Sequence, residues 1–151
     1  MDISSYISGY VDGEGCFTVP FSPRSKLRVG WEVRPSFSVS QNADRSEVLT
    51  AIRKYFGCGW LRPDRSDRTV KYEVRDLADL LTKVIPHFER YPLMSGKQRD
   101  FEKFAIVCRL LERRRHLNRD GLQEIASLAM TMNPSGKRRF QLRELNELHQ
   151  A

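Results

Sequence analysis

The sequence predicts an α+β domain in which a four-stranded, largely antiparallel sheet carries helices on one face. Stretches in which apolar residues recur every three or four positions alternate with stretches in which apolar and polar residues alternate one by one. Their order is helix, two strands, helix, two strands, helix, and the remaining stretches have helical spacing. A length of 151 residues suffices for one sizeable core, so we expect residues 1–151 to form a single domain.

A helix is predicted from about Ile3 to Gly13, where five apolar or aromatic residues recur at helical spacing. Glycines stop this helix, and two carboxylates, Asp12 and Glu14, fall at its C-terminal end. Exposed carbonyls at a helix C-terminus favour a cation, and hard divalent metals prefer oxygen ligands. The end of this helix is therefore a candidate metal site.

A stripe of small residues, Ser5, Gly9 and Gly13, follows one flank of the same helix and would let a second backbone approach closely. The alternative is a surface helix with a glycine cap and two solvated acids. That interpretation must explain two glycines inside a short helix, each costing about 1 kcal/mol against alanine. It must also explain acids at the end that the helix dipole disfavours. We therefore favour a functional role.

Four strands are predicted from alternation. The first runs from Cys16 to about Ser22 and the second covers residues 32–40. The third begins within Gly57–Arg62, and the fourth covers residues 69–75. One side of this sheet is expected to be polar and exposed, and its excess of arginine suits DNA base edges and phosphates better than plain solvation. The predicted polar side carries Arg34, Ser36, Ser38, Arg62, Lys71, Glu73 and Arg75.

The other helices are predicted from caps and apolar stripes. Asp44, with Glu47 at the capping-box position, is expected to begin a helix that Gly57 ends. Asp76 begins a helix that stops near Pro86. In the C-terminal part, a helix is expected to begin at Ser95, with Gln98 as its capping-box partner. Further helices are expected from Asp120 and over residues 142–148, and a basic turn is expected at residues 132–139.

The net charge of +7 and the pI of about 9.6 favour a polyanionic partner, most simply DNA or RNA. The cysteines, Cys16, Cys58 and Cys108, are far apart and lack metal-ligand spacing, so we expect reduced thiols. No secretory signal or membrane-spanning stretch is recognised. We therefore expect an intracellular, reducing location: a bacterial or archaeal cytoplasm, or an organelle.

The segment Ile7–Gly15 resembles the motif of the LAGLIDADG homing endonucleases. Ile-Ser replaces the usual opening Leu-Ala, and Glu14 stands where many members have Asp. Four further segments resemble the family in the right order: Phe37–Gln41, Gly57–Trp60, Ser95–Gln98 and Met132–Arg139. The resemblance covers nearly the whole chain and implies the family's fold, a sheet saddle with helices on one face and further C-terminal helices.

This resemblance implies a site-specific homing endonuclease that makes a staggered double-strand cut in a long pseudo-palindromic DNA site. A single motif implies a homodimer in which the motif helices pack together. The implied interface comprises Ser5, Tyr6, Gly9, Tyr10 and Gly13. Two alternatives on the same fold stay open: an intron maturase, with its own intron RNA as partner, and a non-catalytic DNA-binding regulator.

By resemblance, Glu14 and the Gly13 carbonyl would bind Mg²⁺, which Mn²⁺ is expected to replace, whereas Ca²⁺ is expected to bind without supporting cleavage. Gln41 would order the attacking water, and Arg45 and Lys97 would stabilise developing negative charge. A structural role is expected for Asp12. The residues expected to contact DNA are Thr18, Arg24, Glu32, Arg34, Ser36, Ser38, Arg62, Asp64, Lys71, Glu73, Lys137, Arg138 and Arg139.

Overall fold

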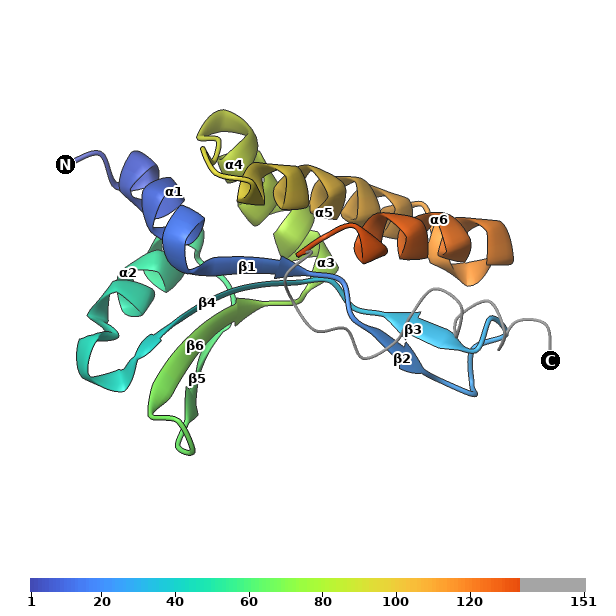
Figure 1. Cartoon of the computed structure of the whole chain (residues 1–151), viewed down its shortest axis with the longest axis horizontal. Helices are drawn as coiled ribbons and strands as arrows, with labels where there is room; N and C mark the ends of the chain where they lie inside the picture. The colour runs from blue at the N-terminus through green and yellow to red at the C-terminus, as the bar shows by residue number, and fades with distance from the viewer. Residues whose placement is uncertain (134–151) are drawn as a thin grey trace.

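The computed structural model describes residues 1–133, with helices on one side of a curved sheet (Figure 1). The strands are β1 (Gly15–Thr18), β2 (Phe21–Pro23), β3 (Trp31–Val33), β4 (Ser36–Asn42), β5 (Trp60–Asp64) and β6 (Thr69–Val74). The α-helices are α1 (Ile3–Glu14), α2 (Glu47–Phe56), α3 (Leu77–Asp79), α4 (Ile85–Arg90), α5 (Lys97–Glu112) and α6 (Arg119–Met130). Short helical turns are the 3₁₀ turns η1 (Ala43–Arg45) and η3 (Arg115–Leu117) and the π turn η2 (Leu80–Val84).

The main sheet has four strands in the order β1-β4-β6-β5, and every neighbouring pair is antiparallel. This confirms the predicted α+β architecture. Phe17 lies opposite Phe37, which lies opposite Val74, and all three are buried toward the helices. Because side chains alternate along a strand, the intervening residues form the second face of the sheet. Figure 1 shows α1, α4, α5 and α6 on the same side of β1.

The remaining two strands, β2 and β3, pair with each other in a separate two-stranded ribbon. The predictions of single strands over residues 16–22 and 32–40 were therefore wrong. Each of these stretches contains a proline, Pro20 or Pro35, between its two strands, and proline cannot donate a ladder hydrogen bond. The ribbon buries Trp31 and neighbouring apolar side chains against α5 and α6, which gives the fold a second core cluster.

Aromatic rings fill the main core. Phe17 lies 5.2–5.5 Å, between ring centroids, from Phe37, Phe88, Phe101 and Phe104. The apolar stripe of α5 is buried as a whole; its members are Phe101, Phe104, Ala105, Cys108 and Leu111. Cys108 is free, and burial raises the pKa of its thiol to about 12; Cys16 and Cys58 are free and half-buried.

Two predicted caps are confirmed and three are wrong. One of the three is the Ser95–Gln98 capping box, since Gly96 is the N-cap of α5 and Gln98 Oε1 accepts from the Leu93 amide. Gly57 ends α2 in the left-handed conformation, and Asp76 accepts a hydrogen bond from the Asp79 amide. Asp44 lies instead in η1, because the chain leaves β4 through a 3₁₀ turn before α2 begins. Asn118, rather than Asp120, caps α6 by accepting from the Gly121 amide.

The helix that was predicted to stop near Pro86 continues to Arg90. The π turn η2 precedes Pro86, and the Ile85 amide donates to the Leu80 carbonyl five residues back. Such a wide turn accommodates a proline that would otherwise clash with the preceding turn. Among the described residues, no helix is long and apolar enough to cross a membrane.

Candidate functional site

The C-terminal end of α1 runs directly into β1, with no loop between Glu14 and Gly15. The Gly15 amide donates to the Val11 carbonyl. A Cβ on residue 15 would lie 2.5 Å from Val11 Cγ1 and 2.9 Å from the Val11 carbonyl oxygen. Glycine is therefore required where helix turns into strand, and this turn fixes where the motif carboxylates point.

Asp12 fastens α1 to the loop before α5. Its carboxylate accepts hydrogen bonds from the Met94 amide at 2.8 Å, from the Ser95 amide at 3.1 Å and from the Ser95 hydroxyl. Partial burial alone would raise the pKa of Asp12, but the hydrogen bonds from Ser95 and Met94 outweigh burial and lower that pKa. These contacts fit the structural role expected of Asp12.

Glu14 has the opposite environment. Its side chain is exposed, as is Gly13, and within residues 1–133 the Glu14 carboxylate makes no hydrogen bond or ion pair. Across the same residues, no three His, Cys, Asp or Glu side chains are grouped so that they could hold a metal ion. A Mg²⁺ ion needs few protein ligands when phosphates supply the others. Glu14 fits that pattern.

Two of the other predicted catalytic side chains reach α1. Lys97, the first residue of α5, donates from Nζ to the Val11 carbonyl at 2.9 Å. Gln41, on β4, donates from Nε2 to the Tyr10 hydroxyl at 2.6 Å. Arg45 is different, because it is exposed on η1 and pairs with its sequence neighbour Asp44 at 3.7 Å. The structure brings Lys97 and Gln41 to the helix and shows no such contact for Arg45.

A buried polar network behind α1 was missed by the sequence analysis. Ser8 Oγ lies 3.1 Å from His87 Nε2, and the Tyr55 hydroxyl lies 2.9 Å from His87 Nδ1. Ser8 also donates to the Tyr91 carbonyl. Burial lowers the pKa of His87 to about 4, so the ring is neutral at neutral pH. The available signal was Ser8 itself, a polar residue beside Ile7 on the inward side of the helix.

The outward side of α1 is bare. We call Ser5, Tyr6, Gly9 and Gly13 the bare face, since all four are exposed. A Cβ at Gly9 or Gly13 would meet nothing within 4 Å. Tyr10, also predicted at the interface, is half-buried. The apolar stripe expected on this helix is thus divided between buried Ile7 and Val11 and exposed Ile3 and Tyr6.

The second face of the main sheet, which we call the polar face, carries Thr18, Arg62 and Lys71 as predicted, with Arg62 directly opposite Lys71. The prediction that Ser36, Ser38 and Glu73 are exposed was wrong: their exposed fractions are 4, 9 and 7%. Ser36 and Glu73 are bonded to each other across the strands, with 2.6 Å between Oγ and Oε2. Their contacts are therefore inside the protein.

The ribbon and the far end of the sheet hold the other predicted DNA contacts. On the ribbon side, Glu32 pairs with Arg24 at 3.2 Å and with Arg34 at 3.7 Å, and both arginines are exposed. Arg75 is half-buried beyond the end of β6. Lys137, Arg138 and Arg139, with the predicted turn at 132–139 beyond residue 133 and the helix at 142–148, lie outside the described residues.

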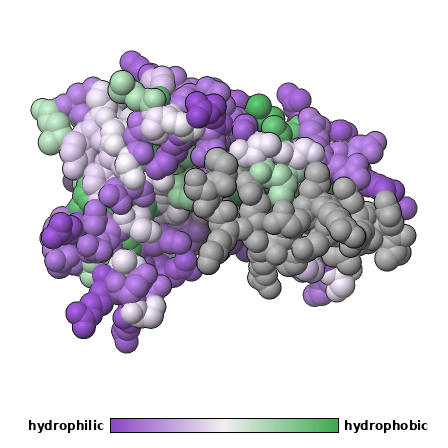
Figure 2. Space-filling model, viewed as in Figure 1, coloured by the Kyte–Doolittle hydropathy of each residue, from purple (hydrophilic) through white to green (hydrophobic). Residues whose placement is uncertain are grey.

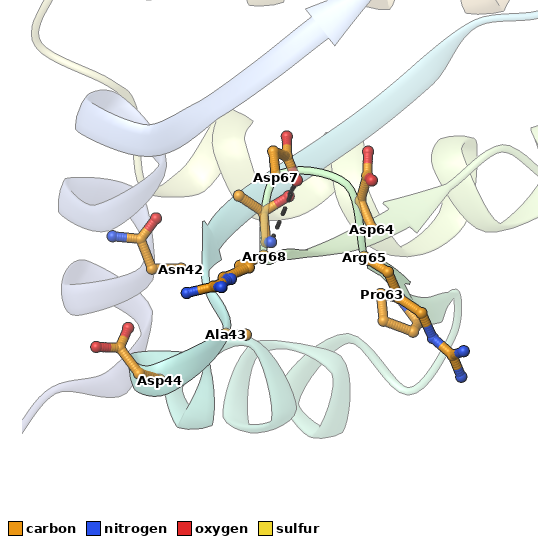
Figure 3. A pocket seen from close by; sticks show the side chains of 9 residues that line it. Asn42, Ala43, Asp44, Pro63, Asp64, Arg65, Asp67 and Arg68 are labelled. Carbon is orange, nitrogen blue, oxygen red and sulfur yellow. Dashed lines mark hydrogen bonds between the residues drawn. The ribbon is translucent and has the colours of Figure 1, made fainter.

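A cavity of about 580 Å³ lies where β4 ends beside the β5–β6 turn. Figure 3 shows Arg68 extending toward Asn42, while Arg65 projects away from it. Asp64, a predicted DNA contact, lines this cavity, and hydrogen bonds from the Ser66 hydroxyl and amide lower its pKa. Figure 2 shows that the surface over this hairpin is hydrophilic. This end of the sheet therefore continues the polar face.

Comparison with known proteins identifies the family. Residues 7–108 match the family model described as LAGLIDADG endonuclease. The chain belongs to the LAGLIDADG endonuclease family, as the motif at Ile7–Gly15 predicts.

Relatives and solved structures agree with this assignment. The homing endonuclease I-ApeII of Aeropyrum pernix is 31% identical over 95% of this chain and 87% of its own. A probable intron-encoded endonuclease of Neurospora crassa is 31% identical over 85% of this chain. That match and two others span 29, 24 and 25% of the relatives' own lengths, so the chain corresponds to about a quarter of those proteins.

Among solved structures, the homing endonuclease I-TnaI superposes with a TM-score of 0.89 and 36% identity, covering 97% of both chains. I-LtrWI bound to its target DNA superposes with a TM-score of 0.85 and 33% identity, over 87% of this chain and 44% of that one. I-SmaMI bound to uncleaved DNA with calcium ions has a TM-score of 0.87 and 28% identity, covering 96% and 48%.

Proposed function

We propose that this protein is a homing endonuclease that cuts both strands of one long DNA site with the help of a divalent metal ion. The observation that carries the proposal is the contrast between the two motif carboxylates. Asp12 is occupied by Met94 and Ser95, whereas Glu14 is exposed and unpaired within residues 1–133. The partial negative charge at the C-terminal end of a helix disfavours an acid there. An exposed, unpaired acid in this position is therefore available to bind a cation.

Glu14 and the Gly13 carbonyl would hold Mg²⁺ against a scissile phosphate. When bound, this metal would activate water and neutralise charge during in-line phosphodiester hydrolysis. Lys97 would place positive charge near the phosphate, and Gln41 would orient water, since both already reach α1. We expect Mn²⁺ to replace Mg²⁺. We expect Ca²⁺ to support binding without cleavage, in line with the calcium-containing complex of I-SmaMI with uncleaved DNA.

The active form proposed is a homodimer joined through the bare face. Two copies of α1 could approach closely along Gly9 and Gly13, where a side chain would meet nothing in a single chain. The two Glu14 carboxylates would then come together and repel unless cations lie between them. A two-fold axis implies a pseudo-palindromic DNA site, and the resemblance to the family implies that the two strands are cut with a stagger.

The polar face and the ribbon would straddle half of this site in the major groove, with Arg24, Arg34, Arg62 and Lys71 as DNA contacts. Arg45 is exposed and pairs with Asp44, and it would reach the phosphates once DNA is bound. The complex of I-LtrWI with its target DNA is consistent with DNA as the partner.

The test is to incubate the protein with a randomised duplex DNA library and Mg²⁺, beside the variants Glu14→Gln and Glu112→Gln. Glu112 is an exposed acid at the end of α5 and serves as the charge-matched control. We expect staggered cuts at one near-palindromic site with the wild type and the control, and none with Glu14→Gln, which should still bind. Cutting that survives Glu14→Gln would contradict the assigned metal ligand.

An intron maturase is the second candidate, because relatives such as the Neurospora crassa protein are described as intron-encoded. Its partner would be the host intron RNA, bound by the same basic chain. If the wild type binds DNA but never cuts it, a splicing assay with the intron RNA separates the remaining possibilities. Accelerated splicing would indicate a maturase, and unchanged splicing a DNA-binding regulator.

A further inference from the structure

A buried carboxylate, Glu73, lies in the middle of the polar face. Its two oxygens have different surroundings. Oε2 accepts a hydrogen bond from Ser36 Oγ at 2.6 Å. Oε1 is inaccessible to solvent and accepts no hydrogen bond within the described part of the chain, although Arg62 Nη2 lies 3.6 Å away. A buried carboxylate oxygen without a full hydrogen bond is costly, so the arrangement needs a reason.

Arg62 is the partner of Glu73 that is exposed to solvent. It lies on the edge strand β5, diagonally across from Glu73, which is itself opposite Trp60. The Arg62 side chain is 57% exposed, compared with 9% for that of Glu73. One nitrogen of the guanidinium faces Glu73, which leaves other N–H groups of the planar fork free to donate outward.

We infer that Glu73 is a positioning residue that aims the Arg62 guanidinium at one guanine in each half of the DNA site. The inference rests on the proposed function and assigns a different role to Glu73 from that of a direct DNA contact. An arginine fork held in one orientation matches the O6 and N7 acceptors of guanine in the major groove. Glu73 is too deeply buried to reach a base itself.

Glu32, the acid that pairs with arginines on the ribbon, is in a different environment from Glu73. Glu32 lies between Arg24 and Arg34, but its side chain is 28% exposed. Water screens such surface pairs, which orient their partners weakly. Glu73 differs because it is anchored by Ser36 on one side and excluded from water, so its charge acts on Arg62 through a low-dielectric surrounding.

The experiment measures binding, in Ca²⁺, to every single-base variant of the DNA site selected from the random library. Arg62→Ala is expected to lower the preference for guanine at one base pair per half-site by about 5- to 150-fold. Glu73→Gln, which keeps the size of the side chain, is expected to lower the preference at the same base pair by at least severalfold. The double variant should lose no more than Arg62→Ala alone, because the two residues act as a unit.

Glu89→Gln is the matched control. Glu89 also pairs with an arginine, Arg109, at 3.0 Å, but this pair is exposed on α4 and α5. The substitution changes the net charge by the same amount and is expected to leave base preference unchanged. The inference is overturned if Glu73→Gln keeps the wild-type preference, or if it alters a different base pair from Arg62→Ala.

If Glu73→Gln does not fold, Ser36→Ala replaces it. This change removes the hydroxyl that anchors Oε2, and it should weaken the guanine preference at the same base pair by a smaller factor. An unchanged preference in Ser36→Ala would then overturn the inference. Failure of the proposed function is distinct. The wild-type protein would then either bind no DNA site selectively, which leaves no preference to alter, or bind its site without cutting it in Mg²⁺, whatever the base preference of the variants.

Discussion

The two sides of α1 lie in opposite surroundings: one side packs into the core, and the other is exposed. The inward side buries Ile7 and Val11 completely and bonds Ser8 to His87. The outward side exposes Ile3 and Tyr6 and presents Gly9 and Gly13, where an added Cβ would meet nothing within 4 Å. Packing within one chain explains the inward residues and leaves the outward ones unexplained. A motif that is continuous in sequence therefore divides into residues that build the fold and residues left free for a partner.

The largest expected effect comes from Ile7→Ala, compared with Ile3→Ala. Both isoleucines lie on α1, but Ile7 is 0% exposed and Ile3 is 42% exposed. Ile7→Ala should lower the free energy of unfolding by about 2–5 kcal/mol, because it leaves a cavity in the core. Ile3→Ala should change it by about 0.5 kcal/mol or less. Chemical denaturation of both variants checks this, and equal losses would show that the two sides are not distinct.

The second expected effect is at the link between α1 and the loop before α5. Asp12→Asn removes a charge that accepts hydrogen bonds from Met94 and Ser95, and it should cost about 1.5–3 kcal/mol. Asp44→Asn, at an exposed acid on η1, is the control and should cost almost nothing. Thermal unfolding at neutral pH measures both.

The same residue predicts a pH dependence. Since folding lowers the pKa of Asp12, its carboxylate stabilises the protein above the unfolded pKa, and this contribution is lost as pH falls through the folded pKa. The acid limb of the stability profile should therefore flatten in Asp12→Asn. An acid limb identical to that of the wild type would show that the Asp12 hydrogen bonds contribute little.

His87 gives a smaller effect at milder pH. Burial lowers its pKa from 6.5 to about 4. Between these two pH values His87 is therefore protonated in the unfolded chain and neutral in the folded chain. The free energy of unfolding starts to fall as the pH drops through 6.5 and keeps falling toward pH 4. The loss is at most about 1.4 kcal/mol between pH 7.5 and 5.5. His87→Gln should remove most of this slope. His116→Gln, at a half-buried histidine whose pKa is also lowered, should remove less of it.

Local patterns predicted the four-stranded sheet and α1, because alternation and helical spacing reflect which side of an element is buried. The same patterns could not predict the β2–β3 ribbon. Apolar residues continue to alternate through Pro35, so the sequence pattern does not register the break that the missing proline N–H imposes on the ladder. Similarly, Pro86 predicted the end of a helix, but the π turn before it lets the helix continue.

At the site, the motif itself was readable from sequence, whereas the partners of its residues were not. The Ser8–His87 contact joins residues 79 positions apart, and the Asp12–Ser95 contact joins residues 83 apart. Such pairs depend on how helices pack, which a single sequence does not specify. The burial of Glu73 was missed for the same reason: alternation identifies the polar face but not which of its side chains are covered by others.

The smallest expected effect comes from Gly9→Ala. It tests the difference between the two sides of α1 most sharply, because it should strengthen the single chain and weaken the proposed dimer. Gly9→Ala should raise the stability of the single chain by up to about 1 kcal/mol, since alanine is the better helix former and its Cβ has open space. The same methyl group should weaken the proposed dimer by holding the two copies of α1 apart. Unfolding at low protein concentration measures the first effect, and sedimentation with DNA cleavage measures the second.

Gly15→Ala is the matched control within the same motif. Its Cβ would collide with Val11, so stability should fall instead of rising. A Gly9→Ala variant that is more stable but dimerises and cuts as well as the wild type would show that the bare face is not the interface. A variant that is more stable yet monomeric and inactive would show that Gly9 is kept for association, against the preference of the helix that contains it.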